Sequence, residues 1–318
     1  MKPLIILTGP TAVGKTELSI ALAKAIGGEI ISADSMQVYK YMDIGTAKIR
    51  PEEMQGVKHH LIDVLEPDVA FNVAVFKEMA KQAVEEIYER GHIPVIVGGT
   101  GFYIQALLYD IDFSEEDSDP KFRNELEFLA KEKGSEYLHT CLSEVDPESA
   151  NQIHHHNVKR VVRALEYYHT HGEKISVHNE RERQKKSPYQ FLYFVLTNDR
   201  KVLYDRIEKR IDQMISEGLV DEVDNLLKMG YNRELVSMQG LGYKEFVSYL
   251  MGECTLEDSI YILKRDTRHF AKRQLTWFRR ERDVRWLDKS TVTSETEILD
   301  KILDTIRTEW SLYDEGNV

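Results

Sequence analysis

The stretch Gly9-Pro10-Thr11-Ala12-Val13-Gly14-Lys15-Thr16 decides the fold, because it matches the phosphate-binding pattern G-x-x-x-x-G-K-[ST]. An apolar run at residues 4–7 precedes it, and apolar side chains recur at helical spacing over residues 17–26 after it. In this setting the loop N–H groups and the helix N-terminus surround a diphosphate, Lys15 adds a point charge, and the Thr16 hydroxyl is a ligand for Mg2+. A glycine turn with an incidental lysine is the alternative, which the strand–loop–helix context disfavours. The motif predicts phosphate binding but does not name a reaction.

Short apolar runs and helical patterns alternate in the flanking sequence. We expect strands at residues 4–7, 29–32, 60–65 and 93–98, and helices over residues 17–26 and 71–90. Such alternation indicates right-handed strand–helix–strand units and a parallel sheet. A further strand at residues 190–196 is expected to return to this sheet, and the chain then reads as helical to about residue 281. The sequence therefore predicts an α/β fold with a P-loop NTPase-like core.

Residues 119–172 carry helix start signals and no convincing strand. An Asp-Pro pair at residues 119–120, and another at 146–147, place a capping residue before a proline at the first helical position. Asn157 is expected to cap another helix, which ends at Gly172. We therefore predict an all-helical insertion at residues 115–187, with the catalytic core formed by residues 1–114 and 188–318.

Composition excludes several classes of protein. The chain has no run near 18 apolar residues, and its N-terminus leaves no room for a signal peptide, so we expect no membrane partner. Only Cys141 and Cys254 are present, which excludes a disulfide scaffold and fits the cytoplasm. The formal net charge of −12 repels nucleic acid on average, so an RNA partner would need a local basic surface.

A carboxylate follows the second expected strand, in the segment Ser32-Ala33-Asp34-Ser35-Met36-Gln37. The end of a strand beside the phosphate-binding loop lies at the edge of the sheet where ligands bind. Asp34 is therefore suited to hold Mg2+ through water or to act as a general base, and a turn or capping role is the alternative. Glycine turns at residues 45–48 and 98–103 are expected at the same edge.

These segments together resemble one family. GPTAVGKT at residues 9–16, ISADSMQVYKYMDIGTAK at 31–48 and VGGTGFYIQALL at 97–108 are similar to the bacterial tRNA dimethylallyltransferases, also called tRNA isopentenylpyrophosphate transferases. The resemblance continues through HNVKRVVRALE at 156–166, KRIDQM at 209–214, GLVDEV at 218–223 and QGLGYKE at 239–245. One departure is His154-His155-His156, where a proline near the helix start is expected.

The resemblance implies transfer of a dimethylallyl group from dimethylallyl diphosphate to N6 of adenosine 37 in tRNA, with release of pyrophosphate. It implies that Asp34 is the general base, that Thr11 contacts the diphosphate, and that Arg210 reaches the leaving group. From the sequence alone, an ordinary solvated helix charge is the alternative for Arg210. A P-loop is typical of proteins that bind ATP and other nucleotides, but here it would hold the allyl diphosphate. The expected diphosphate ligands are Gly9, Pro10, Thr11, Ala12, Val13, Gly14, Lys15 and Thr16, with Mg2+ as cofactor on Thr16.

Basic side chains concentrate in residues 264–285 of this acidic chain. At about 100° per residue, one third of the helix circumference carries Lys264, Arg265, Arg268, Lys272 and Arg279. A separate arc, expected to face the core, carries Ile260, Leu263, Phe270, Trp277 and Phe278. A one-sided basic stripe suits an RNA phosphate backbone, and a solvated face paired with the protein's own acids is the alternative.

The resemblance also implies a tRNA anticodon stem-loop as partner, gripped by the insertion, with adenosine 37 flipped out of its stack to reach Asp34. We expect the protein to act as a monomer. The expected RNA contacts, in addition to Lys272 and Arg279, are Asp34, Ser35, Met36, Gln37, Thr100, Arg123, Lys159, Arg160, Arg163, Gln239, Gly240, Gly242 and Tyr243.

The histidine runs His59-His60 and His154-His155-His156 raise the question of a zinc site, which the sequence disfavours. Adjacent residues on a helix or strand point in different directions, and no carboxylate stands at the usual ligand spacing.

Three other functions remain open. A P-loop kinase of a small metabolite would turn over ATP, but no clear arginine-rich lid motif is present. Isopentenyl transfer to free AMP would leave the helical insertion and the basic helix without a use. A non-catalytic GTPase-like RNA switch would need an NKxD motif, which the sequence lacks.

Overall fold

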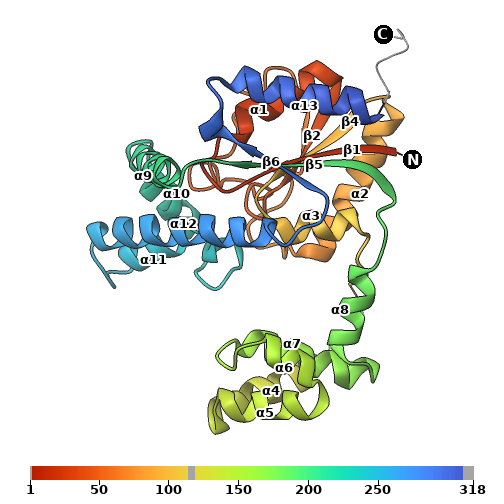
Figure 1. The fold of residues 1–318 in the computed structure, drawn as a ribbon. Coiled ribbons are helices and arrows are strands. Elements are labelled where there is room, and N and C mark those ends of the chain that lie inside the picture. The colour runs from red at the N-terminus through yellow and green to blue at the C-terminus, as the bar shows by residue number, and fades with distance from the viewer. Residues whose placement is uncertain (1, 114–118, 311–318) are drawn as a thin grey trace. The chain divides into compact units, whose positions relative to one another are not determined.

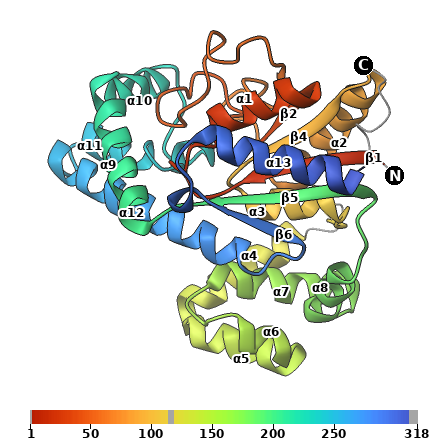
Figure 2. The same ribbon diagram turned by 45° about the horizontal axis from the view of Figure 1, so that its top comes forward.

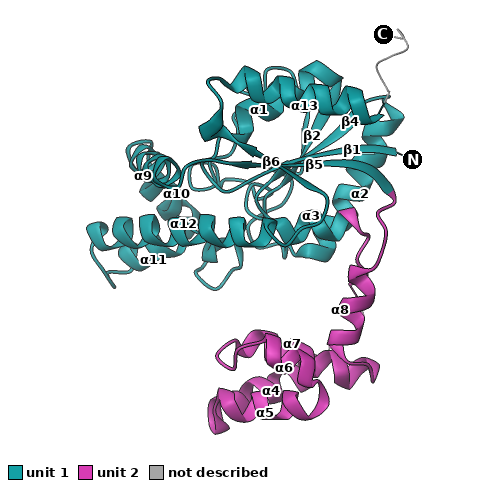
Figure 3. Ribbon diagram, viewed as in Figure 1, with its two compact units in different colours: residues 1–107, 189–318 teal, residues 108–188 magenta. Residues whose placement is uncertain are grey.

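The computed structural model describes residues 2–113 and 119–310. The chain forms two compact units, of which unit 1 comprises Met1–Leu107 and Tyr189–Val318, and unit 2 comprises Leu108–Pro188 (Figure 3). The expected boundary at residues 114 and 115 lies outside the described residues. Each unit is described by itself below.

A six-stranded sheet in the order β3-β2-β4-β1-β5-β6 forms the centre of unit 1, and all its neighbouring strands pair in parallel. Leu4, Ile5, Ile6 and Leu7 of the central strand β1 are fully buried, because helices cover both faces of the sheet. The phosphate-binding loop leaves the carboxyl end of this strand. The strands are β1 (Lys2–Thr8), β2 (Gly28–Ala33), β3 (His59–His60), β4 (Ile93–Gly98), β5 (Tyr189–Thr197) and β6 (Val284–Asp288).

Helices cover both faces of the sheet and its carboxyl edge. Figure 1 shows α1 (Lys15–Ile26) and α13 (Glu295–Trp310) on one face, and α3 (Gly101–Leu108) on the other. The face of α3 also carries α2 (Val73–Glu89) and α12 (Leu256–Phe278). Beyond the carboxyl ends of the strands lie α9 (Arg200–Ser216), α10 (Leu219–Lys228) and α11 (Lys244–Leu250), as Figures 1 and 2 agree. The carboxyl edge, where ligands bind in such sheets, is therefore lined by helices from the second half of the chain.

The predicted α/β fold with a parallel sheet is confirmed, with two differences. The strand predicted at residues 60–65 is wrong beyond its first residue, because Leu61 and Asp63 have φ values of 62° and 56°, which no strand accommodates. The edge strand β6 was not predicted, since none of its five residues is buried and its sequence shows no apolar alternation. Among residues 2–113 and 119–310, every helix is too short or too polar to span a bilayer.

All the regular elements among the described residues of unit 2 are helices. The predicted caps are confirmed: the Asp119 carboxylate accepts hydrogen bonds from the N–H groups of Lys121 and Phe122, and Asp146 and Asn157 cap the next predicted helices. Two helices, α5 and α8, were not predicted. The helices are α4 (Pro120–Lys133), α5 (Ser135–Val145), α6 (Pro147–Gln152), α7 (Val158–His171) and α8 (Ile175–Arg183).

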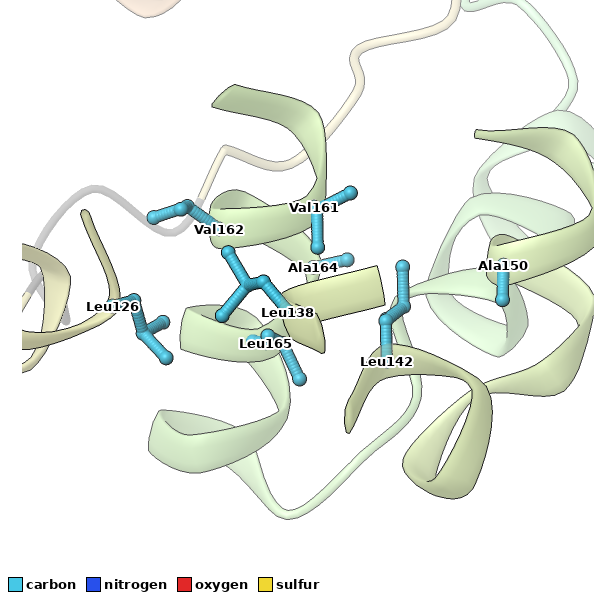
Figure 4. Close-up of a cluster of buried hydrophobic side chains, with 8 residues drawn as sticks. All are labelled: Leu126, Leu138, Leu142, Ala150, Val161, Val162, Ala164 and Leu165. Carbon is cyan, nitrogen blue, oxygen red and sulfur yellow. The ribbon is translucent and has the colours of Figure 1, made fainter. Parts of the chain in front are cut away.

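Unit 2 has a hydrophobic core of its own (Figure 4). Leu138 and Leu142 of α5 are almost completely buried against α7, which contributes Val161 and Leu165. The core residues are Leu126, Leu138, Leu142, Ala150, Val161, Val162, Ala164 and Leu165. A separate core is what an insertion needs in order to fold as its own unit.

Candidate active site

The phosphate-binding loop approaches the neighbouring strand closely at its first glycine. A Cβ on Gly9 would lie 2.6 Å from the carbonyl oxygen of Leu196, and the φ of Gly9 is 150°. The Lys15 ammonium donates hydrogen bonds to the carbonyl oxygens of Gly9 (3.0 Å) and Pro10 (2.9 Å). An ammonium has three donors, so one N–H of Lys15 is left for a ligand in this loop.

Two cations that the sequence reasoning missed lie beside Gly14. A Cβ on Gly14 would lie 2.7 Å from Nζ of Lys289 and 3.7 Å from a guanidinium nitrogen of Arg206. Arg206 also donates to the carbonyl oxygen of Val13, at 3.5 Å. Lys289 follows the unpredicted strand β6, and its ammonium pairs with Glu295. No local sequence pattern marks either residue, because both reach the loop through the fold.

A single buried glutamine joins the phosphate-binding loop to the turn after β4. The Gln274 side chain accepts a hydrogen bond from the Thr11 N–H (2.9 Å) and donates one to the carbonyl oxygen of Gly99 (2.9 Å). Gln274 is 7% exposed and lies on the buried face of α12. A polar residue at a core position of the amphipathic pattern was the signal that could have identified it. The glycine at 99 is needed because a Cβ there would lie 2.1 Å from the Gln274 nitrogen.

The Asp34 carboxylate stands at the end of β2 with one oxygen engaged and one available. Oδ1 accepts hydrogen bonds from the N–H groups of Met36 (2.9 Å) and Gln37 (3.4 Å). Among the described residues, Oδ2 has no hydrogen-bond partner. The Thr100 N–H donates to the carbonyl oxygen of Ala33 at 3.2 Å, so the two turns predicted at this edge are adjacent. The carboxylate is thus oriented by its own turn and able to accept a proton.

The charges of Lys15, Arg210 and Asp34 influence one another. Burial and the nearby Arg210 guanidinium lower the pKa of the Lys15 ammonium to about 8, and Asp34 opposes that shift. Burial also lowers the pKa of Arg210, and Asp34 again opposes it. Arg210 lies 3.5 Å from the Thr11 hydroxyl. The three residues assigned catalytic roles by resemblance, Asp34, Thr11 and Arg210, are therefore brought together with Lys15.

The Thr16 hydroxyl is the group in this loop that suits a magnesium ion. Thr16 is exposed at the start of α1, and its hydroxyl makes no hydrogen bond with the described residues. Oxygen donors of this kind, completed by diphosphate oxygens and water, are what Mg2+ requires. The Thr16 hydroxyl therefore fits the role of a Mg2+ ligand.

The segment after Asp34 packs against the loop that was predicted to contact RNA. A Cβ on Gly240 would lie 2.4 Å from the methyl carbon of Met36, so the two segments pack closely at this glycine. The Gln37 amide donates to the carbonyl oxygens of Thr46 (3.2 Å) and Ala47 (3.3 Å). Met36 and Gln37 thus connect the expected RNA-binding segments of unit 1, in which Ser35, Thr100 and Gln239 are at least partly accessible.

Tyr243 and Gly242 take supporting positions, contrary to the expected direct contacts with RNA. The Tyr243 side chain is fully buried, and its hydroxyl donates to Glu222 at 2.7 Å. Glu222 also accepts hydrogen bonds from the N–H groups of Asp43, Ile44 and Gly45. The Gly242 N–H is used by Glu245. These residues hold the turn at 43–48, and a buried side chain presents no surface to RNA.

The basic stripe of α12 is partly neutralised. Lys264 pairs with Asp212 and Arg268 with Glu208, both carboxylates of α9, and Arg265 pairs with Asp266. Lys272 and Arg279 are exposed, and neither has an ion pair among the described residues. The predicted core arc also differs, since Leu263 and Phe278 are buried but Ile260, Phe270 and Trp277 are only partly so, while Ser259, Ala271 and Gln274 are buried.

The expected RNA contacts of unit 2 also divide into cations that are paired with a carboxylate and cations that are exposed. Arg123 donates to the carboxylate of the buried Glu166 at 2.7 Å, and Arg163 lies 3.7 Å from the same oxygen. Lys159 and Arg160, in the first turn of α7, are exposed and without an ion pair among the described residues.

Comparison with known proteins decides the family. The family model of the IPP transferases matches residues 37–281, which is more than half of the chain. The chain belongs to the IPP transferase family. A protein of Lachnoclostridium phytofermentans named tRNA dimethylallyltransferase is 62% identical over 303 residues, 95% of this chain and 97% of that protein. A protein of the same name from Carboxydothermus hydrogenoformans is 55% identical over 306 residues, 96% of each chain.

Solved structures of IPP transferases agree with the fold. The full-length tRNA isopentenylpyrophosphate transferase of Bacillus halodurans matches with a TM-score of 0.74 and 44% identity, over 99% of this chain and 100% of that one. A eukaryotic dimethylallyltransferase described as acting on tRNA matches with a TM-score of 0.82 and 28% identity, over 98% and 80% of the two chains. The resemblance found in the sequence is confirmed, and so is the P-loop NTPase-like fold.

Replacement of Gln274 tests whether its side chain stabilises this IPP transferase by joining the phosphate-binding loop to the turn after β4. We expect Gln274→Leu to lower the free energy of unfolding by about 1–3 kcal/mol, because the buried Gly99 carbonyl and the part-buried Thr11 N–H both lose their partner. Urea denaturation measures this change. Gln82→Leu, at an exposed position of α2, is the matched control and should stay within about 0.5 kcal/mol of the unmodified protein. Equal stability of all three proteins would contradict the role given to Gln274.

The lowered pKa of Lys15 predicts a pH-dependent affinity for pyrophosphate. Below pH 8 the ammonium is already charged, whereas above it a bound anion must draw a proton onto Lys15, so affinity falls as the pH rises through about 8. Competitive labelling of amines with acetic anhydride, followed by mass spectrometry, reports the titration of Lys15 directly. We expect a midpoint near pH 8 in the free protein, moving upward when pyrophosphate is bound. A midpoint near the ordinary value of about 10 in the free protein would contradict this prediction.

Proposed function

We propose that this protein transfers a dimethylallyl group from dimethylallyl diphosphate to N6 of adenosine 37 in tRNA, releasing pyrophosphate. The observation that carries the proposal is the available Oδ2 of Asp34 at the same edge as the phosphate-binding loop, close enough to affect the pKa of both Lys15 and Arg210. The names of the relatives, tRNA dimethylallyltransferase and tRNA isopentenylpyrophosphate transferase, support this choice of substrates.

The reaction forms one C–N bond and breaks one C–O bond. The exocyclic amine is a weak nucleophile because its lone pair is delocalised into the purine ring, so its proton must be removed as it attacks C1 of the allyl group. Asp34 accepts that proton on Oδ2, while the hydrogen bonds from Met36 and Gln37 hold Oδ1. The electron pair of the breaking C–O bond leaves with pyrophosphate.

The charge that develops on pyrophosphate is stabilised by groups already in position. In the proposed reaction the N–H groups of the loop that are not bonded within the protein, the free N–H of Lys15 and the Arg210 guanidinium would stabilise the leaving group. Mg2+ held by the Thr16 hydroxyl and diphosphate oxygens would neutralise part of the same charge.

The tRNA partner accounts for four cations that have no ion pair among the described residues. Lys272 and Arg279 at the end of α12, and Lys159 and Arg160 at the start of α7, offer exposed positive charge on a net-acidic chain. We propose the anticodon stem-loop as the bound element, with adenosine 37 flipped out of its stack. A monomer acting in the cytoplasm completes the proposal.

One incubation separates this function from the alternatives. Labelled dimethylallyl diphosphate and Mg2+ are supplied with unmodified tRNA that carries A36-A37, with AMP and ATP in parallel reactions. Label in tRNA with release of pyrophosphate supports the proposal. Label in AMP alone would indicate the free-nucleotide reaction, and ATP turnover without label transfer would indicate a kinase.

The role of Asp34 predicts that binding and chemistry separate. We expect Asp34→Asn to retain the affinity for tRNA and to lower the transfer rate by about 100-fold or more, because the amide cannot accept the proton. Filter binding and single-turnover transfer measure the two quantities. Asp68→Asn, the same replacement at an exposed aspartate, is the control and should leave both unchanged. A normal transfer rate in Asp34→Asn would show that Asp34 is not the general base.

Lys272 and Arg279, which have no ion pair in the part of the chain that the structure describes, predict a salt-dependent contribution to RNA binding. The double variant Lys272→Glu/Arg279→Glu should weaken tRNA binding and reduce the slope of log K against log salt by about 1–2, because up to two phosphate contacts are lost. Lys301→Glu/Arg307→Glu makes the same charge change on α13, which lies on the opposite face of the sheet (Figure 1), and should have little effect. Equal salt slopes for the two variants would indicate that the stripe is an ordinary solvated face that does not bind RNA.

A further inference from the structure

We propose that the turn between α6 and α7 in unit 2 binds one divalent transition-metal ion through the imidazoles of His154, His155 and His156. One ring nitrogen from each of the three lies within 4.8 Å of the other two. The inference concerns unit 2 alone and does not depend on the proposed reaction.

The sequence argument against this site is wrong in its premise. Consecutive side chains point apart on a helix or a strand, but His154, His155 and His156 belong to neither, because α6 ends at Gln152 and α7 begins at Val158. In the turn the rings lie close together, with centroids 4.3 Å apart between His154 and His155 and 4.0 Å apart between His155 and His156. The rings of His154 and His156 are 5.1 Å apart.

His155 is the central ligand of the proposed site. Its Nδ1 is buried and has no hydrogen-bond partner among the described residues, which is an uncommon state for a ring nitrogen. A ring nitrogen without a partner is available as a metal ligand.

A fourth histidine, His139, makes hydrogen bonds to the backbone just before the turn. His139 of α5 donates through Nε2 to the carbonyl oxygens of Ala150 (3.0 Å) and Ile153 (2.8 Å), and Ile153 directly precedes His154. This contact holds the beginning of the turn in place while the side chains of His154 and His156 remain exposed and able to rotate.

Metal binding requires the three imidazoles to move closer together, and the turn allows this movement. Nitrogen ligands at about 2.0–2.1 Å from a tetrahedral metal lie about 3.3 Å from one another, so the imidazoles must approach by as much as about 1.5 Å. Rotation of the exposed side chains supplies this movement. The bond that a metal would replace is weak, since the His156 N–H reaches Nδ1 of His154 at 3.2 Å. Three imidazoles with water in the remaining positions favour Zn2+, Cu2+, Ni2+ or Co2+ over Mg2+ or Ca2+.

Cobalt titration of the full chain, prepared without a histidine tag, tests the site. We expect one Co2+ per chain with the visible spectrum of a nitrogen-ligated ion, displaced by Zn2+ and unaffected by excess Mg2+. His155→Asn should weaken binding by about tenfold or more, since even indirect ligand partners cost that much when removed. His169→Asn, at an exposed histidine of α7 in the same unit, is the matched control and should bind Co2+ as the unmodified protein does.

A second variant guards against misfolding. His154→Asn/His156→Asn alters only exposed side chains, and circular dichroism shows whether the helices persist. Loss of the Co2+ site in a folded double variant supports the proposal. Absence of a one-equivalent site, equal affinity in all variants, or a cobalt–thiolate band that points to Cys141 or Cys254 would overturn it.

Discussion

The candidate active site lies at the carboxyl edge of the sheet, here called the functional edge. Its arrangement depends on the two hydrogen bonds of the Gln274 side chain. Three segments meet there: the loop after β1, the turn after β4 and the buried face of α12. Gln274 is 7% exposed and its bond to the Gly99 carbonyl is buried, so loss of this side chain leaves a buried polar group without a partner. The loss would cost about 1–3 kcal/mol, so the three segments hold one arrangement. The contact between Arg210 and the Thr11 hydroxyl relies on that arrangement.

Features with a local cause could be predicted from the sequence. The phosphate-binding loop, the capping residues Asp119 and Asp146, and the placement of Asp34 at a strand end each depend on a few neighbouring residues. Gln274 and Lys289 could not be assigned in this way, because they are more than 250 residues from the loop that they contact. Their roles follow from the sheet order, which brings distant segments to one edge.

The differences between expectation and structure have two origins. The mostly apolar segment at residues 60–65 resembles a strand, yet nothing in its pattern reveals the positive φ of Leu61. Helical spacing groups Lys264 and Arg268 in one stripe, but only the fold brings the carboxylates of α9 against them. Tyr243 belongs to a motif expected to bind RNA, and its buried hydroxyl instead completes the hydrogen bonds of Glu222. Long-range partners decide these last two cases, whereas the first depends on the local backbone.

The cations at the functional edge point to an anionic ligand on energetic grounds alone. Burial lowers the pKa of both Lys15 and Arg210, and each cation is near enough for its charge to matter to the other, so the free protein bears a desolvation cost and a repulsion. A single carboxylate, Asp34, offsets only part of this cost. The allyl diphosphate of the proposed function would bring several negative charges to this loop and relieve both cations. In that reaction the positive charge that binds the substrate would already lie where negative charge develops on pyrophosphate.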